Sequence, residues 1–330
     1  MIMGTKRGAW QVFLTALMAS LLVGFVSTAA AGEECPRGAL DARYCDWDGD
    51  LVADPPADPA DWRDPAQLTF AYTPVEDPAT YADIWAEFLE HLEAVTGKDI
   101  LFFTVESYAA QVEALRAGRL HVAGISTGAV PMAVNQAGFV PFTLMGRLDG
   151  DYGYRMMIIS HVDSDIEELA DLRGRQVAFT SPTSNSGYKA PVALLKAELD
   201  MDPDVDYEPA FSGRHDNSVF GVYNFDYESA AIADSMLYRL ADQGLIDPDQ
   251  IRVVYESDPF PPTAYGYAHD LHPDLVEKIK DAFFSFEWEG TRFQQEFAAS
   301  EEEMFIPITY AEQWQVVRTV EEQLEAMGLD

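Results

Sequence analysis

The sequence predicts an α/β protein with two lobes, each built around a mostly parallel sheet. Short apolar strands alternate with amphipathic helices over most of the chain, which is typical of parallel sheets covered by helices. Several of the predicted strands are followed by polar loops that contain glycine. The chain has 330 residues and is 48% hydrophobic, which is enough for two lobes with separate cores.

The first run of alternating elements begins at residue 68. Short apolar segments predict strands at residues 68–72, 100–105, 121–125 and 140–145. Apolar residues at helical spacing predict helices at residues 81–95, 108–117 and 129–136. Gly118 marks the end of the second helix. This order of strands and helices predicts a mostly parallel first sheet.

A second run has the same character. The apolar segment 154–160 predicts a strand that crosses between the lobes, and residues 164–169 have the pattern of a beginning helix. Further strands are expected at residues 176–179, 207–211, 228–233 and 251–255, the last of which crosses back. Further helices are expected at residues 191–199, 217–224, 234–242, 273–285 and 310–327.

Residues 1–31 have the features of an export signal. Lys6 and Arg7 precede an apolar segment at residues 10–26, and small residues at 27–31 suit cleavage after Ala31. A retained membrane helix is the alternative, but the apolar segment is short for a membrane span. We therefore expect an exported, periplasmic protein.

Residues 32–67 form an acidic N-terminal extension without hydrophobic periodicity. Cys35 and Cys45 are the only cysteines of the chain, and they lie close together in the sequence. In an exported protein two such thiols are expected to form a disulfide. A zinc site is disfavoured because no histidine lies nearby.

The same extension contains four alternating carboxylates around Gly49. These are Asp46, Asp48, Asp50 and Asp54. Clustered carboxylate oxygens are the ligands that calcium prefers, but the spacing departs from the EF-hand pattern. An acidic, solvated loop is therefore the main interpretation, and a calcium site is the alternative. We expect no other cofactor.

The formal net charge of −35 limits the classes of partner. Its long-range field repels nucleic acid and anionic membranes, so neither is expected as a partner. A charge of this size also suggests a saline habitat, where screening relieves self-repulsion. An anionic ligand would have to be held by local donors against this field.

A hydroxyl-rich turn at residues 180–189 lies between the strand at 176–179 and the helix at 191–199. The first turn of a helix offers free backbone N–H groups and a partial positive charge. The hydroxyls of Thr183, Ser184 and Ser186 can add donors, and Gly187 would let a ligand approach the backbone. This arrangement suits a tetrahedral oxyanion. An ordinary helix cap is the alternative interpretation.

Similar loops follow other predicted strands. Tyr72 ends the first strand, Ser126 and Thr127 follow the third, and residues 212–216 follow the strand at 207–211. Because ligands of open parallel sheets bind beyond the carboxyl ends of the strands, these loops are expected to line one pocket. Each could instead be a helix cap.

Four segments resemble the phosphonate- and phosphite-binding periplasmic proteins of ABC transporters. The run Thr-Ser-Asn-Ser-Gly at residues 183–187 resembles their Ser-Thr-Ser-Gly anion loop, and residues 213–216 resemble their Gly-x-His-Asp/Glu loop. Residues 227–231 resemble their Val-Asp-Ala-Ala strand, and residues 107–109 resemble the Tyr-Ala at the start of a helix in lobe 1. The likeness extends from residue 68 to residue 304 in matching order.

The resemblance implies a two-lobed type II periplasmic binding protein fold with a hinged ligand cleft. Lobe 1 would comprise residues 68–155 and 258–330, and lobe 2 residues 156–257. By position, Ser184, Asn185 and Ser186 would hold the oxygens of the anion, and His215 would donate a hydrogen bond. Tyr108 would reach the ligand from the other lobe, and Thr127 lies in the loop of lobe 1 that contacts the ligand.

Glu228 lies where the family has an acidic residue that faces the ligand, although it is longer than the usual Asp. Near an anion a carboxyl group would have to accept a proton from the ligand, pair with His215 or be protonated itself. Selection of a protonated ligand oxygen is one interpretation of Glu228. A solvated Glu at the end of a strand is the other.

The resemblance implies a monomeric solute-binding protein that delivers a small phosphorus oxyanion to an ABC permease. The ligand could be a phosphonate, phosphite or phosphate. A periplasmic sensor of the same fold that signals to a membrane histidine kinase is the alternative. A hydrolase is disfavoured because the sequence contains no nucleophile elbow, Walker loop or histidine-rich metal motif.

Overall fold

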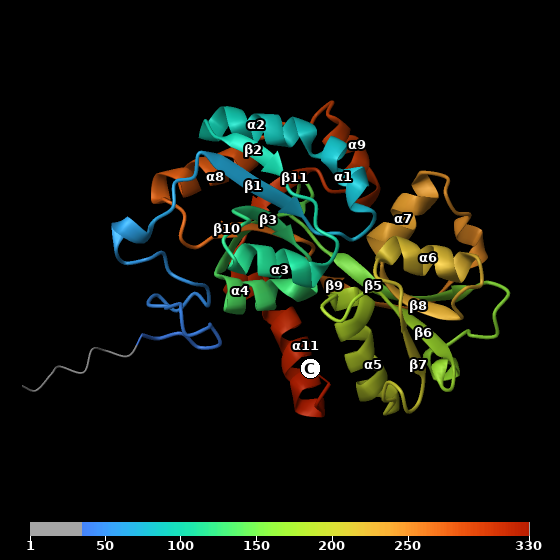
Figure 1. The fold of residues 1–330 in the computed structure, drawn as a ribbon. Coiled ribbons are helices and arrows are strands. Elements are labelled where there is room, and N and C mark those ends of the chain that lie inside the picture. The colour runs from blue at the N-terminus through green and yellow to red at the C-terminus, as the bar shows by residue number, and fades with distance from the viewer. Residues whose placement is uncertain (1–34, 330) are drawn as a thin grey trace, which may run out of the picture. The chain divides into compact units, whose positions relative to one another are not determined.

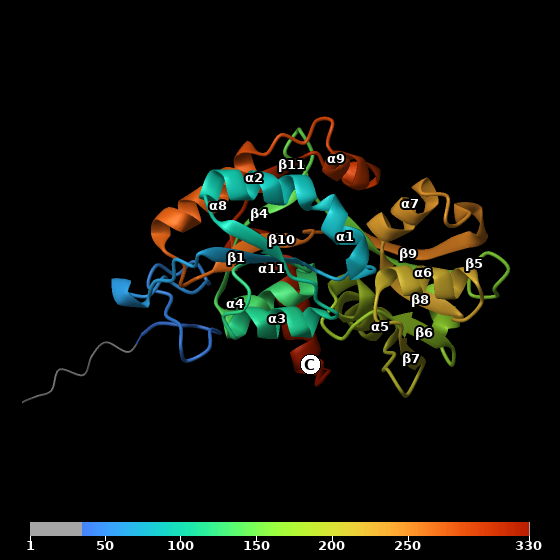
Figure 2. The ribbon, with the colours of Figure 1, turned by 45° about the horizontal axis from the view of Figure 1, so that its top comes forward.

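The computed structural model describes residues 35–329, and the predicted signal peptide at residues 1–31 lies outside them. Within the described part, the strands form a six-stranded and a five-stranded sheet. Helices lie on both sides of each sheet (Figures 1 and 2). None of the described helices is both long enough and apolar enough to cross a lipid bilayer.

The first sheet has the strand order β2-β1-β3-β10-β4-β11. Its strands are β1 (Gln67–Tyr72), β2 (Asp99–Phe102), β3 (Val122–Ile125), β4 (Phe139–Gly146), β10 (Ala264–Ala268) and β11 (Met304–Pro307). β1 pairs in parallel with β2 and β3, whereas β10 is antiparallel to both β3 and β4. The sequence predicted the first four strands but neither β10 nor β11. β10 lies between β3 and β4, so these two strands are not neighbours.

The helices that accompany this sheet agree with the predicted ones, except that residues 292–297 were not predicted to be helical and two predicted helices are divided, one at Trp85 and one at Trp314. They are α1 (Pro78–Ile84), α2 (Ala86–Thr96), α3 (Tyr108–Arg116), α4 (Val130–Ala137), α8 (Pro273–Ser285), α9 (Arg292–Phe297), α10 (Tyr310–Gln313) and α11 (Gln315–Met327). The single helix predicted at residues 81–95 is two helices that meet at Trp85. Ile84, Trp85 and Phe88 are all fully buried, so the apolar spacing continues through the break and could not reveal it.

The second sheet has the order β7-β6-β8-β5-β9. Its strands are β5 (Tyr154–His161), β6 (Gln176–Phe179), β7 (Glu208–Phe211), β8 (Ser229–Ala233) and β9 (Ile251–Phe260). Its helices are α5 (Ala190–Leu199), α6 (His215–Tyr223) and α7 (Asp234–Asp242). β6, β7 and β8 are parallel, and β5 is antiparallel to β8 and β9. All five strands were predicted.

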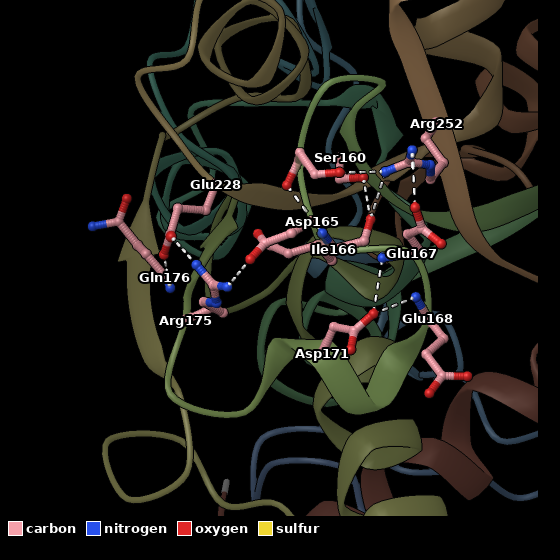
Figure 3. A network of polar contacts seen from close by, with 11 residues as sticks. Ser160, Asp165, Ile166, Glu167, Glu168, Asp171, Arg175, Gln176, Glu228 and Arg252 are labelled. Carbon is pink, nitrogen blue, oxygen red and sulfur yellow. Dashed lines mark hydrogen bonds and ion pairs between the residues drawn. The ribbon is translucent and has the colours of Figure 1, made fainter.

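The helix expected to begin at residues 164–169 is absent from the structure. A short 3-10 turn, Leu169–Leu172, follows instead. The Asp171 carboxylate accepts the backbone N–H groups of Glu167 and Glu168, at 2.9 and 3.0 Å, and Arg252 donates to the carbonyls of Ser164 and Ile166 (Figure 3). Side chains thus satisfy the backbone groups that a helix would have paired internally.

The chain passes from the first sheet to the second between β4 and β5, and returns between β9 and β10. The predicted lobe boundaries at 155/156 and 257/258 fall just inside β5 and β9. The C-terminal α11, which the prediction placed with lobe 1, also contacts α5 of the second sheet. These crossings bring loops from both sheets together.

The N-terminal extension is joined to itself by the predicted disulfide. Cys35 and Cys45 are bonded, with their Cα atoms 5.5 Å apart. The extension also packs against the globular part, because the backbone N–H of Asp41 donates to the carbonyl of Asn135 over 2.8 Å. The disulfide prediction is therefore confirmed.

Gly266 in β10 has no room for a side chain. A Cβ atom there would lie 2.4 Å from the carbonyl oxygen of Val140 and 2.6 Å from the ring of Phe139. Because this carbonyl is part of β4, it cannot move without disturbing the sheet. We expect Gly266→Ala to lower the free energy of unfolding by at least about 3 kcal/mol in urea titrations.

Gly97→Ala is the matched control for Gly266→Ala. Gly97 follows α2 with φ of 69°, and open space surrounds its α-carbon. Only the left-handed backbone opposes a side chain there, so the expected loss is about 1 kcal/mol. Equal losses in the two variants would contradict the close packing of β10 between its neighbours.

Candidate ligand-binding site

A cavity of about 380 Å³ is lined by loops from both sheets. Residues that follow β1, β3, β6 and β8 contribute to it, as expected for the carboxyl ends of parallel strands. Eight of the ten predicted ligand-binding residues line this cavity: Tyr72, Tyr108, Ser126, Thr127, Ser184, Asn185, Ser186 and His215. The structure therefore brings together residues from widely separated parts of the sequence.

Thr183 and Glu228 are not among the residues that line the cavity. The hydroxyl of Thr183 is 3.3 Å from the hydroxyl of Ser181, just before the buried part of the turn. Glu228 directly precedes β8, whereas Ala233 at the other end of β8 lines the cavity. The predicted position of Glu228 at the ligand is thus not supported.

Glu228 belongs instead to a surface network of the second sheet (Figure 3). Its carboxylate accepts a hydrogen bond from Arg175 at 3.1 Å and another from the backbone N–H of Gln176 at 2.8 Å. Arg175 also pairs with Asp165. A proton-selecting role for Glu228 therefore has no geometric basis.

The predicted anion loop forms a π-helical turn, Asn185–Lys189, between β6 and α5. Ser184 caps this turn, because its hydroxyl accepts the backbone N–H of Gly187 at 3.1 Å. A Cβ atom on Gly187 would lie 2.0 Å from the hydroxyl oxygen of Thr180. Gly187 therefore permits close packing on the end of β6, and the approach of a ligand to its backbone stays a prediction.

His215 presents a defined donor to the cavity. Its Nδ1 atom accepts the backbone N–H of Ala233 at 3.1 Å, so the neutral ring carries its proton on Nε2. Nε2 lies 3.5 Å from the hydroxyl of Ser184. Burial, together with the charge of Arg239, lowers the pKa of His215 to about 4. The imidazole is therefore a neutral hydrogen-bond donor at neutral pH.

Two buried hydroxyl groups among the lining residues lack hydrogen-bond partners in the described structure. They belong to Tyr108, at the start of α3, and Ser126, which follows β3. The amide oxygen of Asn185 is also without a partner, although its nitrogen donates to the Tyr154 hydroxyl at 3.1 Å. Burial raises the pKa of Tyr108, so its hydroxyl stays protonated. Both hydroxyls are available to bind ligand oxygens.

Thr127, unlike Ser126, already has hydrogen-bond partners within the protein. Its hydroxyl donates to the carbonyl of Pro261 at 2.8 Å, and its carbonyl accepts the indole N–H of Trp314 at 3.0 Å. Pro261 lies between β9 and β10, where the chain crosses between the sheets. Thr127 thus ties the loop after β3 to this crossing.

The cavity also contains carboxyl groups that the sequence did not point to. Asp234, at the start of α7, and Glu302, just before β11, both line it. Burial raises the pKa of Asp234, and burial raises the pKa of Glu302 to about 7. Asp234 directly follows β8. The rule that ligands bind beyond the carboxyl ends of parallel strands, which predicted Ser184, could therefore have predicted Asp234 as well. Glu302 belongs to a segment with no such signal.

The acidic loop of the extension brings three predicted calcium ligands together. Oxygen atoms of Asp46, Asp48 and Asp50 lie within 4.8 Å of one another. Asp46 also accepts the backbone N–H of Gly49 at 2.8 Å, and Asp54 accepts that of Trp47 at 2.6 Å. Calcium binding by this loop stays a prediction.

Two α/β sheets joined by crossing strands, with a cavity between their loops, define a type II periplasmic binding protein. Residues 70–313 match the model of the family described as "ABC transporter, phosphonate, periplasmic substrate-binding protein". The chain belongs to this family. It is therefore the periplasmic substrate-binding component of an ABC transporter rather than an enzyme, and the sensor alternative finds no support.

Two curated relatives carry related names. The phosphate-import protein PhnD of Mycolicibacterium smegmatis is 28% identical over 242 residues, which are 68% of this chain and 75% of that protein. The phosphonates-binding periplasmic protein of Escherichia coli is 22% identical over 223 residues, which are 66% of each chain.

Solved structures support the fold. A binding protein component of an ABC phosphonate transporter from Pseudomonas aeruginosa aligns with a TM-score of 0.72 and 21% identity, covering 81% of this chain and 90% of that one. PhnD1 from Prochlorococcus marinus, in complex with methylphosphonate, aligns with a TM-score of 0.69 and 15% identity, covering 81% of this chain and all of that one.

Glu302→Gln tests the raised pKa of this half-buried carboxyl group. Because the pKa of Glu302 rises from 4.5 to about 7, the folded protein holds this proton more tightly than the unfolded chain. The resulting stabilisation is fully present below about pH 4.5 and is lost as the pH rises through 7. Glu302→Gln should therefore stabilise the ligand-free protein more at pH 8 than at pH 5, by a difference of about 1–3 kcal/mol in the free energy of unfolding, and its melting temperature should rise accordingly.

Glu322→Gln is the control, since Glu322 is exposed on α11. Its difference from the wild type should be the same at both pH values. A Glu302→Gln variant whose melting temperature follows that of the wild type from pH 5 to pH 8 would show that Glu302 is ionised throughout this range.

Proposed function

We propose that the protein captures a small phosphonate through buried neutral donors and presents it to a membrane permease. The observation that carries this proposal is the pair of unpartnered hydroxyl groups on Tyr108 and Ser126, in the same cavity as the Nε2 donor of His215. A tetrahedral group with several oxygens can accept from all three.

The remaining features of the proposal follow from charge and sequence. The protein would act as a monomer, and it would have no nucleic-acid partner, because its net charge of −35 repels polyanions such as DNA and RNA. It would be exported with the signal peptide at residues 1–31, cleaved after Ala31. The permease would recognise the ligand-bound form.

Tyr108→Phe isolates the contribution of one hydroxyl to binding. The variant removes only an oxygen that has no partner in the ligand-free structure, so folding stability should be unchanged or slightly higher. Affinity for methylphosphonate should fall by about 1–2 kcal/mol, or roughly 5–30-fold, in isothermal titration calorimetry.

Tyr207→Phe is the matched control. The Tyr207 hydroxyl is also buried without a partner, but Tyr207 does not line the cavity. Both variants should therefore have similar stability, and only Tyr108→Phe should bind more weakly. Unchanged affinity in Tyr108→Phe would remove this hydroxyl from the site.

We further propose that the ligand carries a cationic substituent. Asp234 and Glu302 place two carboxyl groups in the cavity that holds the oxyanion donors. Near an anion these groups are unfavourable unless they are protonated or meet a positive charge. An ammonium group on the ligand would supply that charge and would offset the repulsion.

The substituent is tested by comparing 2-aminoethylphosphonate with methylphosphonate at pH 8. The amino ligand should bind about tenfold more tightly, since a buried charge pair contributes more than an exposed one. Asp234→Asn should reduce this preference, because it removes the partner of the ammonium group and also removes a carboxyl group that opposes methylphosphonate. Equal affinities of the wild type for both ligands would exclude the cationic substituent without affecting the oxyanion site.

A further inference from the structure

A buried ion cluster joins the two sheets at the ligand cavity, and its arginine, Arg239, is one of the residues that line the cavity. Arg239 lies on α7, and its side chain is only 9% exposed. Its Nη2 atom is 2.6 Å from Oε1 of Glu76, and its Nη1 atom is 3.5 Å from Oε1 of Glu296. Nη2 also donates to the hydroxyl of Tyr81 at 3.4 Å. We call Arg239, Glu76 and Glu296 the clasp.

The members of the clasp come from different sheets. Arg239 belongs to a helix of the second sheet, whereas Glu76 lies in the loop between β1 and α1 and Glu296 lies on α9. The Glu76 loop has another link across the cavity, because the backbone N–H of His215 donates to the carbonyl of Val75 at 3.1 Å. The clasp therefore lies next to the imidazole that faces the ligand.

The charges of the clasp depend on one another. Glu76 and Glu296 have side-chain exposures of 8% and 16%, so neither carboxylate is well hydrated where it lies. Removal of one partner from a buried ion cluster leaves an uncompensated charge, whereas removal of the whole cluster can be nearly neutral. If the two sheets move apart, water hydrates all three groups. An unpaired charge then costs little, so a variant that lacks one partner favours the separated sheets.

We propose that Arg239 is a positioning residue for ligand capture, and that the clasp holds the two sheets together over the bound ligand. In this role the clasp slows ligand release without itself binding the ligand. Loss of Arg239 alone leaves two buried carboxylates facing each other, which favours separation of the sheets. Loss of all three charges removes that repulsion.

The test compares Arg239→Met with the triple variant Arg239→Met/Glu76→Gln/Glu296→Gln. Stopped-flow fluorescence gives the association and dissociation rates of methylphosphonate, and small-angle X-ray scattering gives the radius of gyration without ligand. Arg239→Met should release the ligand roughly tenfold faster with nearly unchanged association, and its ligand-free form should be larger. The triple variant should recover most of both properties.

Arg175→Met is the matched control, because Arg175 also pairs with two carboxylates, Asp165 and Glu228, but within the second sheet alone. Its rates and radius should equal those of the wild type. If Arg239→Met does not fold, Glu76→Gln/Glu296→Gln replaces it, since it also leaves one buried charge alone and should release the ligand faster.

Two outcomes would overturn the proposal. Wild-type release and radius in a folded Arg239→Met would show that the clasp does not hold the sheets. Weak binding that the triple variant fails to recover would make Arg239 a direct ligand contact, for which its buried, unpartnered Nε atom is available. Because the inference rests on the ligand site proposed above, the ligand-free radius tests the clasp even if methylphosphonate does not bind.

Discussion

Buried hydroxyl groups without hydrogen-bond partners raise the free energy of a folded protein, and the ligand cavity contains two of them, on Tyr108 and Ser126. A ligand with several oxygens satisfies both groups at once. Binding therefore relieves a cost already present in the ligand-free protein, where water is the only competitor. The two sheets position these groups. Ser126 follows β3 and the Ser184 turn follows β6, and both loops face the same cavity.

The donors on Tyr108, Ser126 and His215 are neutral, which suits a protein with a net charge of −35, although Arg147 and Arg239 also line the cavity. A distant negative surface is screened over about 10 Å at 0.1 M salt, whereas a hydrogen bond acts at contact. His215 illustrates the principle, because the bond from Ala233 to its Nδ1 atom fixes the proton on Nε2. The ring can thus donate a hydrogen bond to an anion while it is uncharged. A charged ring would instead be attracted to the acidic groups around it.

The position of a residue relative to the end of its strand explains which predicted ligand-binding residues line the cavity. Ser126, Ser184 and His215 lie after strands or at helix starts, so the shared edge of the parallel strands places them together. Glu228 lies at the opposite end of β8, and the family resemblance did not reveal this shift, whereas Asp234 follows β8 and reaches the cavity. β10 escaped prediction because Ala264–Ala268 is short and contains Gly266, a residue type depleted in strands.

The donors of the site come from both sheets: Tyr108 and Ser126 belong to the first sheet and its helices, and His215 belongs to a helix of the second. Ser126 and Ser184 reach one ligand only while the two sheets are held at a fixed separation. A buried ion cluster adds little net stability but strongly disfavours arrangements in which one partner is missing. Arg239, held between Glu76 and Glu296, thus specifies one separation of the sheets more than it stabilises either of them. Retention of the ligand then depends on direct donors and on this specificity together.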